Sequence, residues 1–304
     1  MQALIGSLPG AVCQGLIWGI LAIGLYITNK ILDISDLTVD GSICTGASVC
    51  AVMIVGGVDP YVATLCAIPA GMLAGLITGI LHTVFNIPAI LAGILTQQML
   101  WTVNLKIMNT SYLSVNTRTI PVLVRSAAEE DSAIVLTIVA FIVIAVLYWF
   151  FGTSFGCSIR ATGCNINMSR AQGINTNFNK IFGLAISNGI IALAGALLCQ
   201  YNGASDITMG RGAIVIGLAA IIIGEVLFSK IARNFAVRLV CVVFGSVIYF
   251  VIMQVVAFGK IDPDAFKLIS ALIVAIFLAA PLMKEKLLRW LKDDNSKTEV
   301  KKDA

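Results

Sequence analysis

The groups that most enzymes use for catalysis are scarce in this sequence. Its 304 residues include one histidine, His82, and no GxxxxGK[ST] phosphate-binding loop. A lone histidine without a neighbouring nucleophile is poor material for acid–base or covalent catalysis. The eight cysteines contain no CxxC pair, so neither a zinc site nor a disulfide framework is indicated. We expect no catalytic residue, no metal and no cofactor in this chain, and any ATPase coupled to it must be a separate subunit.

Uncharged polar residues are better candidates for binding. Gln97, Trp101 and Asn104 follow an i, i+4, i+7 spacing, which places them on one face of a helix. Such groups bind and release a solute without the large desolvation cost of a charge. We expect these three residues, together with Asn188, to line a translocation path. Ordinary hydrogen bonding between helices is the alternative for all four.

Two carboxylates lie in or beside apolar stretches. Glu225 lies near the end of one stretch, within reach of Lys230 or Arg233 if the helix continues. An ion pair would let this charge reach the interface, and a role in gating or subunit contact is the alternative. Asp36 is the second candidate for gating or for an ion pair.

The composition shows that these residues lie in a membrane protein. Hydrophobic residues make up 59% of the chain and charged residues 12%, and the mean hydropathy is +0.96, whereas a soluble domain carries roughly a quarter charged residues. Several apolar stretches have the length that crosses a hydrocarbon layer of roughly 30 Å. We expect an all-α integral membrane protein with about nine segments. They lie at residues 8–28, 42–57, 61–81, 87–105, 132–151, 181–200, 213–229, 236–257 and 266–283.

The second segment, 42–57, differs from the others. It is short and rich in Gly, Ser, Thr and Cys, so we expect a half-crossing or a broken helix packed inside the protein. The centres of the segments contain almost no ionisable residues, which disfavours an ion-coupled secondary transporter.

Lysine and arginine are unevenly distributed among the connections. They concentrate in residues 152–180 and 228–238 and after residue 283. Because cytoplasmic loops are enriched in these residues, we expect the N-terminus outside and the C-terminus inside. Residues 1–283 then form the transmembrane domain, and the charged tail 284–304 is expected to be disordered. Lipid headgroups and topology explain the basic residues better than nucleic acid does.

The connection 152–180 carries the most informative pattern. It holds Arg160 and Arg170, the glycines Gly163 and Gly173, and a short helix-capable piece between them. The glycines suit tight turns, and such a piece can dock in a groove of another protein. A plain solvated loop is the alternative.

These residues resemble the permease subunits of bacterial ABC importers of the ribose and branched-chain amino acid type. The family pattern in this connection is matched by Gly156, Ile159, Ala161, Gly163, Asn165, Gly173, Ile174 and Asn175. A second match begins at Asp36 and continues to Ser42, with Asp40 as an apparent insertion. The resemblance covers residues from about 8 to 283.

The resemblance implies an importer subunit in the bacterial plasma membrane. It implies a homodimer or pseudo-symmetric dimer of permeases in membrane lipid, a cytoplasmic ATPase that uses ATP and Mg²⁺, and an external substrate-binding lipoprotein. The residues that would couple to the ATPase are Arg160, Gly163, Asn165, Arg170, Gly173, Ile174 and Asn175. Within the family the chain is similar to permeases for tryptophan or tyrosine uptake, so an aromatic amino acid is the expected solute. Secondary transport, an intramembrane enzyme and export remain the alternatives.

Overall fold

The computed structural model describes residues 2–117, 120, 122–228 and 234–258, with five single positions between 268 and 279. The chain divides into two units, Met1–Gln254 and Val255–Ala304, and the first unit holds almost all of the described residues. Apart from those single positions, the predicted ninth segment and the predicted tail lie outside the described residues.

Helices dominate the described part of the chain. Eight of them coincide with eight predicted membrane segments: α1 (Gln2–Tyr26), α2 (Val39–Val55), α3 (Pro60–Thr83), α4 (Ala89–Met108), α5 (Glu129–Gly152), α8 (Thr176–Asn202), α9 (Ala213–Phe228) and α10 (Phe235–Ala257). A π-helical turn, η1 (Ile27–Ile31), extends α1, and two short helices, α6 (Ser154–Cys164) and α7 (Ile166–Ala171), lie between α5 and α8.

Five stretches of the described chain are long and apolar enough to cross a membrane. They are Gly6–Ile31, Pro60–Thr83, Glu129–Gly152, Thr176–Asn202 and Phe235–Ala257. Helix α4 has 20 residues but is more polar, because Gln97, Gln98 and Asn104 interrupt its apolar sequence. Long apolar helices of this kind show a multi-pass membrane protein.

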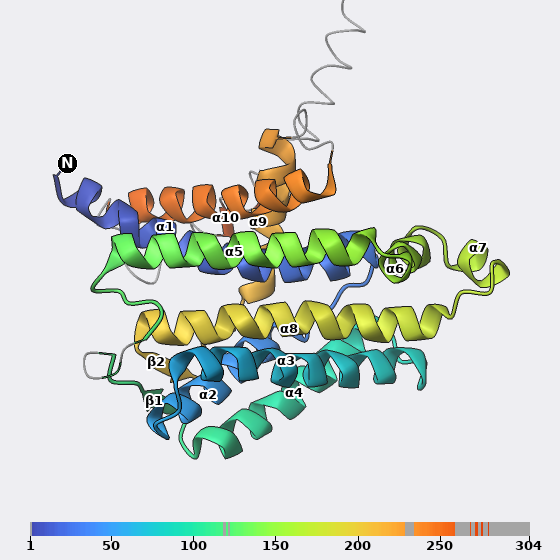
Figure 1. Cartoon of the computed structure of the whole chain (residues 1–304), viewed down its shortest axis with the longest axis horizontal. Helices are drawn as coiled ribbons and strands as arrows, with labels where there is room; N and C mark the ends of the chain where they lie inside the picture. Colours follow the sequence, from blue (N-terminus) through green and yellow to red (C-terminus); the bar gives the residue numbers. More distant parts are fainter. Residues whose placement is uncertain are drawn as a thin grey trace, which may run out of the picture. The chain divides into compact units, whose positions relative to one another are not determined.

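Helix α8 is the centre of the first unit. It packs against α1, α2 and α3, and most of its side chains are buried. Helices α3, α5 and α8 run along a common direction (Figure 1). Gly71 and Gly75 let α3 approach α8 closely, since a Cβ atom on either would collide with the α8 backbone at Asn188 or Leu184. Small residues at such positions are typical of helix packing in membranes.

Helix α2 is short because the chain before it is not helical. Its 17 residues rise about 25 Å, less than a hydrocarbon core of roughly 30 Å. Ser42, in the first turns of α2, donates to Asn188 near the middle of α8, over 2.6 Å. The segment 32–38 therefore enters the bundle before α2 begins. The prediction of a short, buried second segment is confirmed, but the helix itself is unbroken.

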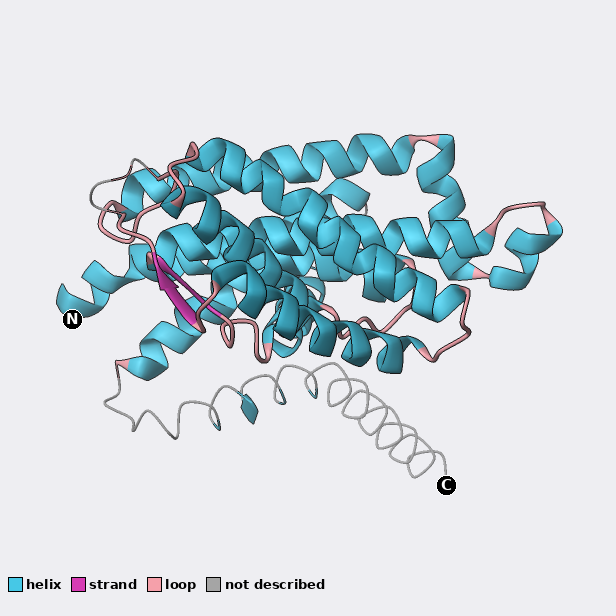
Figure 2. Cartoon of the chain, turned by 90° about the horizontal axis from the view of Figure 1, so that it is seen from below, coloured by secondary structure: helices cyan, strands magenta, loops and turns pink. Residues whose placement is uncertain are grey.

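A small β-pairing is the one departure from the all-α prediction in the described residues. Strand β1 (Tyr112–Ser114) pairs antiparallel with β2 (Ala204–Asp206). Figure 2 shows these strands at one end of the bundle, and Figure 1 shows α6 and α7 at the opposite end. The two ends of the bundle therefore differ: one carries the β1–β2 pairing and the other carries the short helices α6 and α7.

Candidate functional site

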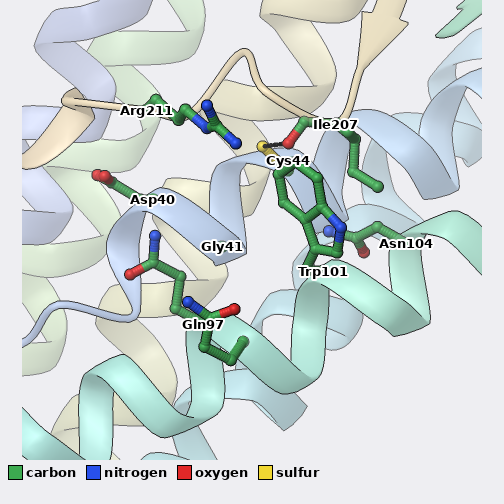
Figure 3. Close-up of a pocket in the computed structure, with 9 residues that line it drawn as sticks. Asp40, Gly41, Cys44, Gln97, Trp101, Asn104, Ile207 and Arg211 are labelled. Atoms are coloured by element: carbon green, nitrogen blue, oxygen red, sulfur yellow. Dashed lines mark hydrogen bonds between the residues drawn. The ribbon is translucent and has the colours of Figure 1, made fainter. Parts of the chain in front are cut away.

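A cavity of about 180 Å³ lies between α2, α4 and the segment that precedes α9. Three predicted path residues, Gln97, Trp101 and Asn104, line it together from α4 (Figure 3). The other lining residues are Asp40, Gly41 and Cys44 of α2, Gln98 of α4, and Ile207 and Arg211. We refer to this space, together with its lining residues, as the cavity. Its lining combines amides, one carboxylate, one guanidinium and one indole.

Asp40 holds two helix starts together beside the cavity. It lies in the first turn of α2, and its carboxylate accepts hydrogen bonds from the backbone N–H groups of Gly212 (3.0 Å) and Ile214 (3.1 Å) at the start of α9. A carboxylate at a helix N-terminus satisfies free N–H groups and the helix dipole. Sequence reading treated Asp40 as an insertion, and the signal that was missed is an acidic residue at the start of a helix.

Arg211 faces the cavity from the segment before α9. Its guanidinium carbon lies 5.2 Å from the centroid of the Trp101 ring, which is a cation–π contact. No carboxylate among the described residues lies within 4.0 Å of its guanidinium nitrogens. Arg211 was not predicted, because nothing in its own neighbourhood of the sequence indicates that Trp101 is close.

Asn104 has an unused acceptor. Its side chain is 1% exposed, and its Oδ1 atom has no hydrogen-bond partner among the described residues. An unsatisfied buried polar group costs about 1–3 kcal/mol. Asn104 lines the cavity, but its Oδ1 atom is itself buried and makes no hydrogen bond there.

Asn188 does not line the cavity. It is fully buried, and its Nδ2 donates to Asp36 Oδ2 (2.7 Å) and to the Leu184 carbonyl (3.0 Å). Asp36 Oδ1 accepts from the Thr38 N–H over 2.9 Å. The two residues thus belong to one buried hydrogen-bond network that joins α8 to the segment before α2. Neutral donors, and no cation of the described chain, bind the Asp36 carboxylate, so the ion-pair interpretation of Asp36 is wrong for the described residues.

Glu225 forms an ion pair with an unexpected partner. Its Oε2 lies 2.8 Å from Lys30 Nζ in η1, and both side chains are about two-fifths exposed, at 38% and 40%. The predicted partners Lys230 and Arg233 lie outside the described residues. The described chain thus pairs Glu225 with a lysine from the other end of the sequence, and the predicted pairing with Lys230 or Arg233 stays a prediction.

The connection between α5 and α8 folds into two helices rather than one. Asn165 caps α7, since its Oδ1 accepts from the Met168 N–H over 3.0 Å, and Asn175 caps α8 by accepting from the Phe178 N–H over 3.1 Å. Gly173 ends α7 with a φ of +78°, a conformation that favours glycine. Ile174, half-buried, donates its N–H to the Ser169 carbonyl and completes that turn. Residues 154–175 are called the tip below.

Gly163 has a different role from the predicted one. It lies inside α6, and a Cβ atom on it would collide with the Ile31 carbonyl of η1. It therefore permits close packing and forms no tight turn. Gly156 is similar, because its Cβ would meet the backbone at Phe150 and Phe151.

The two arginines of the tip point to different surroundings. The Arg160 guanidinium carbon lies 4.3 Å from the Phe235 ring centroid and 5.2 Å from that of Phe151. Arg170 is exposed, and its Nε donates to Thr176 Oγ1 over 3.1 Å. Of the two positive charges predicted to face a partner, Arg160 is packed against aromatic rings of its own chain. Arg170 remains available, beside the exposed side chain of Met168.

Two further cavities lie within the first unit. An apolar one of about 690 Å³ is bounded by α3, α5 and α8, and a polar one of about 360 Å³ includes Glu129, Tyr201 and Gln254. No group of three or more His, Cys, Asp or Glu in the described chain could hold a metal ion.

Comparison with known proteins agrees with this architecture. A family described as "Branched-chain amino acid transport system / permease component" matches residues 8–278. The chain is 42% identical to the tyrosine transport system permease protein of Clostridioides difficile over 268 residues, which is 88% of each chain. It is 37% identical to the uncharacterized protein RP368 of Rickettsia prowazekii, covering 88% of this chain and 95% of that one.

A more distant relative comes from another transport system. The autoinducer 2 import system permease protein LsrC of Yersinia pseudotuberculosis is 28% identical, covering 68% of this chain and 58% of the relative. The family match spans nearly all of the described helices, and several of them are long and apolar enough to cross a membrane. The chain is therefore a multi-pass membrane protein that belongs to the family of branched-chain amino acid transport system permease components.

Proposed function

We propose that this chain is the permease subunit of an ATP-driven importer, that its solute is an aromatic amino acid, and that the cavity lies on the solute path. The observation that carries the proposal is the convergence of Gln97, Trp101 and Asn104 on one cavity. The relative from Clostridioides difficile, named as a tyrosine transport permease, supports the solute class.

The backbone around the cavity supports a place on the path. Helices α2 and α9 have 17 and 16 residues, and both begin at the Asp40 carboxylate. Non-helical backbone at membrane depth is tolerated where it is buried in protein or lines a cavity. Transporters commonly build solute sites from such interrupted helices. The arrangement fits a solute site better than a purely structural helix contact.

The tip is the proposed contact with the ATPase. Its exposed apolar side chains Ile166 (36%) and Met168 (60%) lie within four residues of Arg170 in the sequence, and Phe178 (53%) is exposed at the start of α8. A small apolar surface with a charged neighbour suits a protein groove. The partner ATPase would bind ATP and Mg²⁺, since this chain has no P-loop. Movement of the docked tip would then bias the permease between two states.

We extend the proposal to the remaining parts of the importer, and family membership supports an ATPase and a binding protein as partners. We place the tip in the cytoplasm and the β1–β2 end outside, where a substrate-binding lipoprotein would deliver the solute. Two copies of the permease would form the complete path in the bacterial plasma membrane. The exposed apolar side chains of α3 and α5 would face lipid or the second copy.

The proposed function is tested by replacing Asn104, whose side-chain oxygen has no hydrogen-bond partner in the described chain. Asn104→Leu should reduce uptake of radiolabelled L-tyrosine at least tenfold in proteoliposomes that contain the permease, the ATPase and the receptor. Because the substitution removes an unpaired buried oxygen and keeps a similar shape, it should not lower the thermal stability of the complex. Normal uptake by this variant would remove the cavity from the path.

Val103→Leu is the matched control, because Val103 lies beside Asn104 on the exposed face of α4 (45% exposed). Uptake by the control should equal that of the unchanged protein. To separate an importer from an ion-coupled transporter, the same assay is run after ionophores collapse the ion gradients. Uptake that depends on the gradients and not on ATP would favour the ion-coupled alternative.

A further inference from the structure

Arg211 has no carboxylate within 4.0 Å of its guanidinium nitrogens in the described chain, although the Asp40 carboxylate lines the same cavity. Its guanidinium lies over one face of Trp101, and its side chain is exposed. Guanidinium groups have five N–H donors and bind carboxylates in a bidentate manner. The stacked guanidinium and indole thus place an anion-binding group next to an aromatic ring.

Asn104 supplies a complementary acceptor in the same cavity. Its oxygen is buried, has no partner in the described chain and lines the cavity that Arg211 also lines. A side-chain movement that opens the cavity to this oxygen would let a ligand supply the missing donor. The cavity therefore holds a cation, an aromatic ring, amide groups and the Asp40 carboxylate within one space of about 180 Å³, and that carboxylate is already hydrogen-bonded to the start of α9.

We propose that Arg211 is the residue that selects for a carboxylate in the solute, and that the cavity binds an aromatic amino acid in its zwitterionic form. The solute carboxylate pairs with Arg211, its ammonium donates to Asn104 Oδ1 once the cavity opens to that atom, and its ring packs against the Trp101 side chain. This inference rests on the proposed function and adds the chemistry of recognition to it.

Asp40 positions Arg211 for this role. Its two hydrogen bonds to the N–H groups of Gly212 and Ile214 fix the backbone directly after Arg211. The carboxylate thus holds the segment that carries the guanidinium against α2. Without this anchor the arginine side chain would keep its charge and lose its place over Trp101.

The charge of Arg211 separates an amino acid from a sugar. A neutral sugar also stacks on an indole and bonds with amides, but it has no anion to pair with the Arg211 guanidinium. A zwitterion neutralises the guanidinium and supplies the donor that Asn104 lacks. Binding by a permease must also be weak enough for release, which one exposed arginine permits.

The test measures binding to the full permease together with its ATPase, in lipid nanodiscs and without the receptor. Ligand-observed NMR is suited to weak binding, and four probes are compared: L-tyrosine, tyramine, 4-hydroxyphenylpropanoate and D-ribose. Tyramine lacks the carboxylate, and 4-hydroxyphenylpropanoate lacks the ammonium. We expect L-tyrosine to bind at least tenfold more tightly than tyramine, and D-ribose to give no signal.

The decisive variant is Arg211→Gln, with Arg211→Lys as the control that keeps the charge. In Arg211→Gln the preference for L-tyrosine over tyramine should fall to near onefold, whereas Arg211→Lys should keep part of it. General damage to the fold would weaken all probes equally and leave the ratio unchanged. This ratio therefore reports on the carboxylate contact and not on stability.

Three results would overturn the inference. They are an unchanged ratio in Arg211→Gln, a D-ribose signal as strong as that of L-tyrosine, or no signal from any probe with the unchanged protein. If ATP-driven tyrosine uptake persists while one of these occurs, the inference fails and the proposed function stands. If tyrosine binding depends on Arg211 but uptake does not require ATP, the importer proposal fails instead.

Discussion

The cavity and the tip use their polar residues in opposite ways. At the tip, Asn165 and Asn175 cap helices and Arg160 lies between aromatic rings. At the cavity, Asn104 has an unpaired oxygen and Arg211 has no carboxylate partner in the described chain. The asparagines of the tip cap its own helices, and the one buried polar side-chain atom there without a hydrogen-bond partner in the described chain, Arg160 Nε, belongs to a side chain packed on aromatic rings, whereas the unpaired groups of the cavity line a space.

This difference separates two kinds of functional residue. The tip residues that match the family pattern build a rigid protrusion, and the side chains free to touch a partner lie between them, as Met168 and Arg170 do. In our proposal the cavity residues recognise a ligand through groups that are left unsatisfied at a cost in stability. The family pattern therefore follows the shape of the tip, whereas the proposed binding role of the cavity rests on unpaired groups that converge on one space.

The largest expected effect tests whether close packing of α6 against η1 determines the shape of the tip. Gly163→Val places side-chain atoms against the Ile31 carbonyl of η1, where no space exists, and overpacking typically costs about 1–3 kcal/mol. A clash with backbone cannot be relieved by a rotamer change. We expect a clearly lower melting temperature of the purified permease and loss of the co-purifying ATPase.

Gly152→Val is the matched control for this change. Gly152 ends α5, is exposed, and has no heavy atom within 4 Å of the position of a Cβ. The control should keep both melting temperature and associated ATPase. Equal behaviour of the two variants would mean that Gly163 has no packing role.

A second test compares the two arginines of the tip under one substitution. Arg160→Gln removes a cation–π contact between α6 and two phenylalanines, so the melting temperature should fall by an amount equivalent to about 1 kcal/mol. Arg170→Gln removes an exposed charge, so it should leave the melting temperature unchanged and weaken ATPase association by several-fold. Thermal unfolding and pull-down of the ATPase measure the two effects separately.

The comparison of the arginines can fail in a defined way. If Arg160→Gln loses the ATPase without any change in melting temperature, Arg160 contacts the partner and the structural role is wrong. If neither variant affects association, the contact with the ATPase lies outside residues 154–175. Either result would weaken the distinction between shape and contact at the tip.

Sequence reasoning found the elements but not the pairings between them. Eight predicted segments match helices, because the hydropathy of each stretch is local information. The shared face of Gln97, Trp101 and Asn104 was also local, since it depends only on the helical period. Arg211 was missed because its position over Trp101 depends on the path of the chain between β2 and α9.

Residue type alone also led to errors, because two residues of the same type can have different roles. Gly163 and Gly173 looked equivalent in the sequence, yet one permits close packing and the other adopts a positive φ. Asn188 and Asn104 are both buried asparagines, yet only Asn104 lines the cavity. In each case a distant partner decides the role, such as Ile31 for Gly163 and Asp36 for Asn188.

The smallest expected effect concerns the ion pair that lies between the two regions. Lys30 belongs to η1, whose Ile31 packs against Gly163 of the tip, and Glu225 belongs to α9, whose start is held at the cavity by Asp40. An exposed ion pair contributes about 0–1 kcal/mol, so Glu225→Gln should barely change the melting temperature. If the pair helps α9 follow the tip, ATP-driven uptake should fall by about two- to threefold, which corresponds to less than 1 kcal/mol.

The charge-swapped double variant, Lys30→Glu with Glu225→Lys, should restore uptake, because it restores the attraction with the same two side chains. Uptake that stays low in the double variant would show that Glu225 acts through some other contact, and that the tip and the cavity communicate without this ion pair.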